Sequence, residues 1–457
     1  MSGLRPLRIR HAAWALPVAG AVTLAPLIER PLRGAAVIGA AAALAGVIAA
    51  ARRLGLAGAW LAALAGSIMA GEMAAIGFGG QSGRLLWADA VLALGLAVAI
   101  ARGRAIEIPR ASFLAWLAPL LAWCAVGLLW APDPLTGIAE LKEWVVAALA
   151  GAAALVWARD ASRARRLLMM VALTGLVVAA AMVGVALRNP LGLIAAVMLK
   201  RVDLPWGRSN YLAGLLILAF PIALGLLGSA RRAWARAAWG ACLAILALGL
   251  VVSASKGAIA ALLLAFVAAF LPARGIGRGS RAFVLGVIVA CAVLVLATPL
   301  HRVLSYRLAE SALDYSSGER VALYRLAWNC FVRHPWGGIG LNNFSVAANA
   351  LHGVDTVPHN LELGFLAELG LPGFALAALW IGALGRSCWR CRRAAGEPRA
   401  RALAIGIWGS WLAFVLHNQI ESTLYGEQLK LLLFLTAAAA WRLGEGSSDS
   451  GARRSMS

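Results

Sequence analysis

Long apolar runs separated by short charged breaks make up most of this 457-residue chain. A helix needs roughly 17 to 25 apolar residues to cross a membrane, and such runs recur about fourteen times between Ala12 and Trp441. Inside lipid every backbone polar group must be paired within the protein, which a helix achieves by itself. The runs therefore predict an all-α polytopic membrane protein of about 12–14 transmembrane helices. Their approximate bounds are 12–28, 34–51, 55–78, 84–101, 113–130, 139–158, 166–187, 210–228, 233–252, 257–273, 281–299, 361–385, 402–417 and 427–443.

Composition and the placement of charge support this interpretation. Hydrophobic residues are 62% of the chain, charged residues only 14%, and mean hydropathy is +0.81, all far from the values of a soluble domain. The net charge of +22 suggests nucleic acid, but most arginines gather in alternate loops, which is the topology signal of cytosolic loops. We therefore expect cytosolic termini and no nucleic-acid partner. These arginines include Arg52, Arg53, Arg102, Arg104, Arg163, Arg165, Arg231, Arg232, Arg392 and Arg393.

The order of spans and loops predicts five regions. Residues 1–187 form N-terminal transmembrane helices, and residues 188–299 form central ones that follow a basic outer loop at 188–209. Residues 300–360 form a large outer loop that folds as a mostly helical cap, with an amphipathic helix from Glu319 to Arg333. Residues 361–443 are the C-terminal transmembrane helices, and residues 444–457 are a disordered cytosolic tail.

His359 is the strongest candidate for chemistry because it stands where the large outer loop meets an apolar span. An imidazole can accept a proton from a hydroxyl near neutral pH. Pro358 suits a helix start, and His359 and Glu362 are three residues apart, which places them on one helical face. Glu362 or the later Glu368 could therefore orient the ring, whereas the alternative is an interfacial histidine that bonds only to a loop.

Cations on the outer face form a second group that runs against the usual cytosolic bias. Guanidinium groups match phosphate oxygens in pairs, so a diphosphate is the favoured ligand, although contact with lipid headgroups would also explain single positions. Lys256 is the clearest single candidate for binding a diphosphate, because it is the only charged residue between two apolar runs. The group comprises Lys200, Arg201, Arg208, Lys256, Arg302, Arg307, Arg320, Arg325 and Arg333.

Two kinds of motif are missing from the sequence. There is no Asp-x-Asp pair and no His, Cys or Glu cluster at ligand spacing, so we expect neither a metal nor another cofactor. A phosphate-binding glycine loop is also absent, and we expect no use of ATP. Arginine would then supply the positive charge that magnesium supplies in other enzymes.

Several short motifs, taken in order, resemble the O-antigen ligase and polymerase family over about residues 190–440. They are Asn210 at the start of a span, Ser255-Lys256-Gly257, Ser317-Gly318-Glu319-Arg320 followed by Trp328, Pro335-x-x-Gly-x-Gly340 followed by Phe344, and His359-Asn360 followed by Glu368-Leu369-Gly370. In that family the residues matching His359, Arg201 or Arg208, and Arg320 are functional. Lys256 departs from the pattern, since relatives usually carry arginine there.

The resemblance implies a metal-independent, inverting glycosyltransferase of the bacterial inner membrane with a periplasmic active site. Its donor would be an undecaprenyl-diphosphate-linked glycan and its acceptor a hydroxyl of lipid A-core oligosaccharide, within a lipid environment. We expect His359 to deprotonate the acceptor with support from Glu362 or Glu368. Arg201, Arg208, Lys256 and Arg320 would bind the diphosphate, and Asn210, Tyr324, Trp328 and Asn360 are candidate substrate contacts.

Three alternatives remain open at this point. An O-antigen polymerase and a protein O-oligosaccharyltransferase belong to the same family, and ligase is favoured because the chain carries no added soluble domain. A transporter of lipid-linked sugar or anions is a different class. Transporters favour broken helices and charges near the bilayer midplane, whereas the cations here gather at one face.

Overall fold

The computed structural model describes residues 72–78, 81–86, 108–188, 202–204, 207–270, 315–353 and 356–445, with single positions at 58, 60, 63 and 91. The chain divides into two compact units. One comprises residues Met1–Met73 and Leu85–Ala105, and the other comprises Ala74–Arg84 and Ile106–Ser457. All of the helices that carry the candidate site belong to the second unit.

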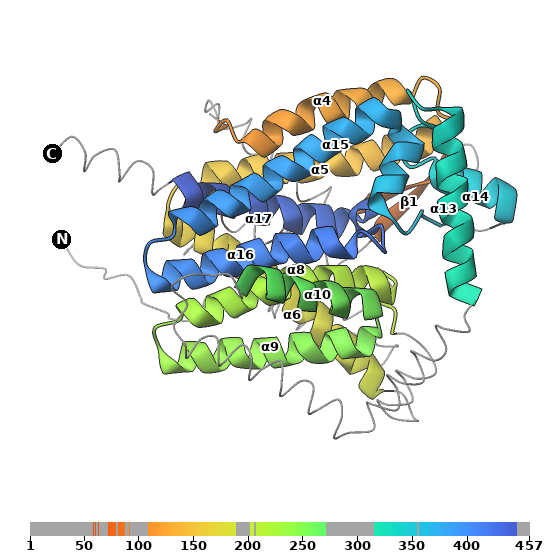
Figure 1. Cartoon of the computed structure of the whole chain (residues 1–457). Coiled ribbons are helices and arrows are strands. Elements are labelled where there is room, and N and C mark those ends of the chain that lie inside the picture. The colour runs from red at the N-terminus through yellow and green to blue at the C-terminus, as the bar shows by residue number, and fades with distance from the viewer. Residues whose placement is uncertain are drawn as a thin grey trace, which may run out of the picture. The chain divides into compact units, whose positions relative to one another are not determined.

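Helices form almost all of the described chain (Figure 1). The helices before the large outer loop are α4 (Ser112–Gly127), α5 (Pro134–Trp157), α6 (Ala161–Leu187), α8 (Ser209–Ser229), α9 (Ala233–Ser253) and α10 (Lys256–Phe270). The segment predicted to be the large outer loop contributes α13 (Tyr315–Arg333) and α14 (Phe344–His352). The remaining elements are α15 (Leu361–Ala394), α16 (Pro398–His417), the short 3₁₀ turn η3 (Thr423–Tyr425) and α17 (Glu427–Glu445).

The predicted all-α membrane fold is confirmed. Five of the described helices, namely α6, α8, α9, α15 and α16, are long and apolar enough to cross a membrane. α4 and α10 are shorter apolar helices, and α5 and α17 coincide with two further predicted spans. The expected spans 12–28, 34–51 and 281–299 lie outside the described residues.

A β-hairpin replaces part of one predicted span. Strands β1 (Glu72–Phe78) and β2 (Gln81–Leu86) pair with each other, where a helix over 55–78 and the start of another at 84 were expected. In the sequence the two strands are separated by Gly79-Gly80, and such Gly-Gly pairs favour tight hairpin turns. The apolar count of this segment was therefore misleading, because its glycines permit an extended hairpin.

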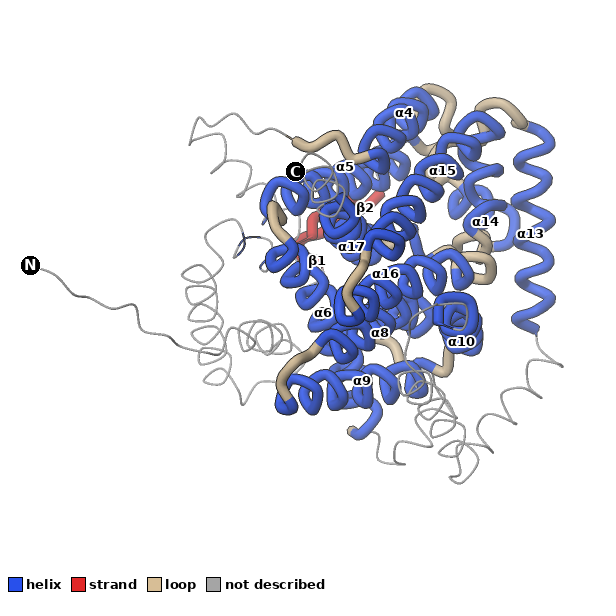
Figure 2. The backbone as a smooth tube through the Cα atoms, turned by 60° about the vertical axis from the view of Figure 1, so that its left-hand side comes forward, coloured by secondary structure: helices blue, strands red, loops and turns tan. Residues whose placement is uncertain are grey.

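The second unit is a layered bundle whose centre is α8. Nearly every side chain of α8 is buried, and the helix packs against α6, α9 and α16. Figures 1 and 2 both show α13 lying across one end of the bundle rather than along it. α13 buries Leu323, Leu326 and Ala327 against Phe344 of α14 and Ala367 of α15. The cap expected from the large outer loop is therefore helical in its described part.

The glycine motif after α13 closes that loop onto a kink in α15. Gly370 has a positive φ of 65° inside α15, and the chain bends there. The amides of Ile339 and Gly340 donate to carbonyls of Ala367 and Glu368, at 2.9 and 2.8 Å. At Gly338, φ is also +65° and a Cβ atom would lie 2.2 Å from the Glu368 carbonyl oxygen. Only glycine fits this approach, so the motif has a packing function.

Candidate active site

One buried carboxylate joins three side chains that the sequence had singled out separately. Glu421, in the turn between α16 and α17, accepts hydrogen bonds from Asn210 Nδ2 and Arg320 Nη2 on its Oε1 atom, each at 2.6 Å. Its Oε2 atom is 2.8 Å from His359 Nδ1. The three partners come from the start of α8, from α13 and from the residue pair preceding α15. Glu421 therefore assembles a His-Glu-Arg cluster at the α13 end of the bundle.

The turn that carries Glu421 is hydrogen-bonded to the start of α15. Leu361 N donates to Asn418 O at 2.9 Å, and Asn360 Nδ2 donates to Gln419 O at 2.9 Å. The Asn360 Oδ1 atom also caps α15 by accepting from Leu363 N. Asn360 therefore holds two backbone segments together, which is the role that the structure gives to this candidate substrate contact.

His359 and Glu362 do not share a helical face, contrary to the expectation. Asn360 is the N-cap, so α15 begins at Leu361 and His359 lies outside it with a positive φ of 55°. The Glu362 carboxylate instead accepts from Gln419 Nε2 at 2.7 Å, at the surface. The three-residue spacing misled because it assumed helical geometry at a residue that precedes the helix.

The backbone conformation of His359 directs its ring into the cluster. A left-handed φ is costly for a residue with a side chain, and such residues concentrate at functional sites. Tyr324 on α13 donates its hydroxyl to the His359 carbonyl at 3.3 Å, so that this candidate residue supports the histidine from above. The ring is about a quarter exposed, and its Nε2 atom is 3.4 Å from Thr356 Oγ1.

The electrostatics of the cluster favour an ionised Glu421. Burial acts to raise the pKa of this carboxyl, but the hydrogen bond and charge of His359, together with Arg320, outweigh it and lower the pKa. An ionised carboxylate can only accept hydrogen bonds, so the facing His359 Nδ1 carries the proton. In a neutral ring, Nε2 is then the nitrogen that carries the lone pair and can accept a proton.

The structure places the predicted diphosphate-binding cations at different distances from the cluster, and one of them lies outside the described residues. Arg320 joins the cluster and remains about one-third exposed. Arg208 precedes α8 and is exposed, two residues from Asn210, whereas Arg201 lies outside the described residues. Lys256 is half-buried at the first position of α10, and the next residue, Gly257, lies against the Ile420 and His417 side chains. The start of α10 therefore abuts the turn that holds Glu421.

Glu368 and Trp328 do not contact His359. The Glu368 carboxylate is buried and accepts from the amides of Asn342 and Phe344 and from the Tyr425 hydroxyl, at 2.9 to 3.1 Å. It thus secures the loop before α14, and the expected support of the imidazole by Glu368 is not what the structure shows. Trp328 is half exposed on α13 and packs on Phe331, with ring centroids 5.4 Å apart.

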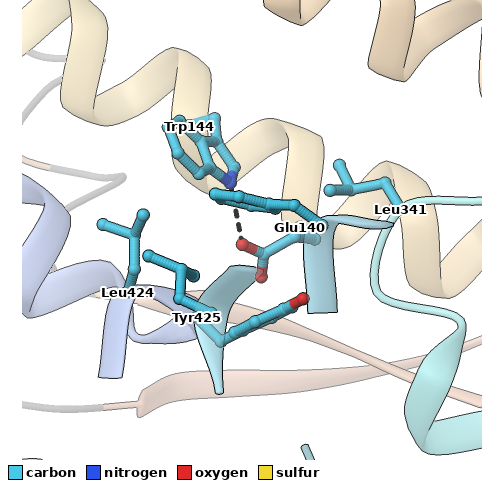
Figure 3. Close-up of a pocket in the computed structure, with 7 residues that line it drawn as sticks. Glu140, Trp144, Leu341, Leu424 and Tyr425 are labelled. Carbon is cyan, nitrogen blue, oxygen red and sulfur yellow. Dashed lines mark hydrogen bonds between the residues drawn. The ribbon is translucent and has the colours of Figure 1, made fainter. Parts of the chain in front are cut away.

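A buried ion cluster lies beneath the Glu421 turn, between α5 and α17. Lys430 is fully buried and pairs with Glu140 and with Glu143, the latter at 2.9 Å, while also donating to the Tyr425 carbonyl. Figure 3 shows Glu140 accepting from Trp144 Nε1 beside Tyr425. The pocket that these residues line is too narrow to hold a water molecule. These contacts fix the end of the turn that presents Glu421.

Sequence reasoning missed Glu421 and His417. Both lie where α16 ends, in the segment His417-Asn418-Gln419-Ile420-Glu421. His417 is fully buried, and neither of its ring nitrogens has a hydrogen-bond partner in the described structure. The available signal was a titratable pair in a short polar turn between two apolar spans, on the face predicted for His359. Within the described residues, no three His, Cys, Asp or Glu side chains are grouped to hold a metal ion.

Part of the chain matches a known family model. Residues 240–378 match the family model described as O-antigen ligase. The matched segment includes Lys256, Arg320 and His359, whereas Asn210 and Glu421 lie outside it. A comparison with curated proteins gives no match. The match confirms the resemblance drawn from the motifs: residues 240–378 of this multi-pass membrane protein are similar to the O-antigen ligase family.

Proposed function

We propose that the protein is an O-antigen ligase that transfers glycan from undecaprenyl diphosphate to a hydroxyl of lipid A-core oligosaccharide at the periplasmic face of the inner membrane. The family match supports a ligase- or polymerase-type transferase that uses lipid-linked glycan. The observation that carries the proposal is the contact of His359 and Arg320 with one carboxylate, because the reaction needs a base and a cation close together.

In the proposed reaction, His359 Nε2 takes the proton from the acceptor hydroxyl. The acceptor oxygen forms a bond to the anomeric carbon while the bond from that carbon to the diphosphate oxygen breaks. The leaving undecaprenyl diphosphate keeps the electron pair. Direct displacement by one hydroxyl inverts the anomeric centre. Glu421 holds the ring through Nδ1 and stabilises the imidazolium that forms.

Positive side chains neutralise the departing diphosphate in this scheme. Arg320 is already in the cluster, Arg208 lies at the start of the helix that carries Asn210, and Lys256 begins a helix that contacts the Glu421 turn. Arg201 completes the set as an expectation from sequence. Preorganised charge aimed at a leaving group is a large contribution to catalysis, and here it requires no divalent metal.

Glu362, Glu368 and Asn360 act as positioning residues in this proposal. Glu362 and Asn360 hold the 418–421 turn against the start of α15, and Glu368 holds the loop before α14. Tyr324 supports the His359 backbone. Trp328 stays a candidate contact for the substrate glycan, because its ring is half exposed on the helix that carries Arg320.

The test is glycan transfer by purified protein, with an undecaprenyl-diphosphate-linked glycan, rough lipopolysaccharide as acceptor and a chelator present. Wild type should convert the acceptor to a larger product on gels, and His359→Ala should lose this activity. Lengthened lipid-linked glycan without modified lipopolysaccharide would identify a polymerase instead. Transport of the donor without a new glycosidic bond would overturn the proposal, as would wild-type transfer by His359→Ala.

A further inference from the structure

A cluster of tryptophan and arginine lies at the opposite end of the bundle from His359. Arg392 and Arg393 place their guanidinium carbons 4.9 and 5.2 Å from the ring centroid of Trp389, near the end of α15. Trp389 packs on Trp408 of α16 at 5.1 Å, and Trp408 stacks on Trp411 at 4.9 Å. Figure 1 shows α15 running from the α13 end to the far end, where it turns into α16.

The position of Trp389 matches a membrane boundary. Trp389 follows the kink residue Gly370 by 19 residues, which corresponds to about 28 Å of helix and to the hydrocarbon thickness of a bilayer. At the Gly370 end, the Trp336 backbone lies against the kink and the Trp130 ring lies against the adjacent Gly337. The side chains of both tryptophans are exposed. Tryptophan is enriched at both membrane surfaces. α15 therefore spans from one aromatic belt to the other, with Arg392 and Arg393 at headgroup level.

The two guanidinium groups lack an anionic partner within the described structure. In the described part of the chain, neither guanidinium group forms a hydrogen bond or an ion pair besides its cation–π contact with Trp389, and Glu397, the nearest acid along the chain, forms no ion pair. Two cations held against one ring repel each other, and an anion bound between or above them would offset this repulsion. Guanidinium groups bind phosphate oxygens in a paired geometry.

The packed rings of Trp389, Trp408 and Trp411 favour a lipid over a free anion as the ligand. Trp411 lies against Gly385, one helical turn deeper in the membrane than Trp389, and Phe270 and Trp408 pack in one cluster with Ile405. Trp408 and Trp411 are only partly buried, so they present apolar surface below the arginines. The cluster thus combines charge at headgroup level with flat apolar surface at acyl-chain level.

We propose that Trp389, Arg392 and Arg393 form a binding site for the phosphate headgroup of an anionic phospholipid, with its acyl chains along Trp408 and Trp411. The site is independent of glycan transfer and lies at the other end of the bundle. Basic residues near an anionic lipid surface contribute about fivefold each to binding. Loss of both arginines should therefore weaken binding roughly 30-fold.

The experiment measures lipid binding to delipidated full-length protein by native mass spectrometry, with phosphatidylglycerol and phosphatidylcholine as probes. Wild type should retain phosphatidylglycerol preferentially, and Arg392→Gln/Arg393→Gln should lose that preference. The matched control is Arg231→Gln/Arg232→Gln, which removes the same charge from exposed positions in the α8–α9 turn. That turn lies at the same end of the bundle, because Gly228 of α8 meets Ala402 of α16.

The outcomes separate a built site from general electrostatics. Retention of phosphatidylglycerol by the control, together with its loss in the Arg392/Arg393 variant, supports the site. Equal loss in both variants, equal binding of the two lipids by wild type, or unchanged binding by the Arg392/Arg393 variant overturns it. Trp389→Leu keeps both charges and should weaken binding by a smaller factor. Glycan transfer is measured in parallel, and its failure would leave the lipid result unaffected.

Discussion

Replacing Glu421 with glutamine tests the central geometry most directly. The amide oxygen of glutamine can still accept from Asn210 and Arg320, so the shape of the cluster is kept. Its NH₂ group would then face His359 Nδ1, 2.8 Å away in the wild type, and would donate to it. The imidazole would carry its proton on Nε2 instead, and that atom could no longer accept the proton of the acceptor.

The expected loss is that of general-base catalysis and of the charge that stabilises the imidazolium. General bases contribute about 10²- to 10⁴-fold, so Glu421→Gln should lower kcat by this factor, which corresponds to roughly 3 to 5 kcal/mol of activation free energy. The KM for the lipid-linked donor should not rise, because the substitution frees Arg320 from an ionic partner. A kcat loss without a KM increase separates this role from loss of substrate binding.

Steady-state glycan transfer with purified variants measures both constants. Glu397→Gln is the control, since it removes an exposed carboxylate in the α15–α16 turn at the other end of the bundle. Glu421→Asp keeps the charge one methylene further away and should recover part of the rate. Wild-type kcat in Glu421→Gln would refute the reasoning, and so would an equal loss in Glu397→Gln.

Two further predictions concern stability. Lys430→Met leaves Glu140 buried without its cation, and such a change should destabilise the protein by about 3–5 kcal/mol. Thermal unfolding in detergent should show a much smaller effect for Arg163→Met, because Arg163 and its partner Asp160 are both exposed. Gly338→Ala should cost several times more than Gly353→Ala in the same assay. Both glycines have φ near +65°, but a Cβ atom meets the Glu368 carbonyl only at Gly338, so equal losses would contradict the packing role of the motif.

Hydropathy and charge predicted the helices because both signals are local. The spans that become α8, α9 and α16 differ from the predicted ones by only a few residues, and the outer ends that were expected to meet do bring Asn210, Arg320 and His359 together. Local signals failed where glycines allowed another backbone. The hairpin at Glu72–Phe78 replaced part of an apolar run for this reason.

The partner of the histidine could not be found from spacing along the chain. Glu362 is three residues from His359 and bonds to Gln419, whereas Glu421 is 62 residues away and contacts the ring. That contact depends on where two helices end: α15 begins at Leu361 because Asn360 caps it, and α16 ends at His417. Composition alone does not fix either boundary. The Asn360 side chain determines where α15 begins, and the polar turn after His417 marks where α16 ends.

The shared carboxylate of Glu421 links the proposed base to the proposed leaving-group cation. Glu421 uses one oxygen for Arg320 and the other for His359, so in the substrate-free site the positive charge of Arg320 is already balanced. A diphosphate that draws Arg320 away leaves Glu421 with an uncompensated negative charge next to the imidazole. That charge favours the protonated ring. Donor binding should therefore strengthen His359 as a base at the moment when a leaving group is present, which provides a physical reason for placing an acid between these two residues.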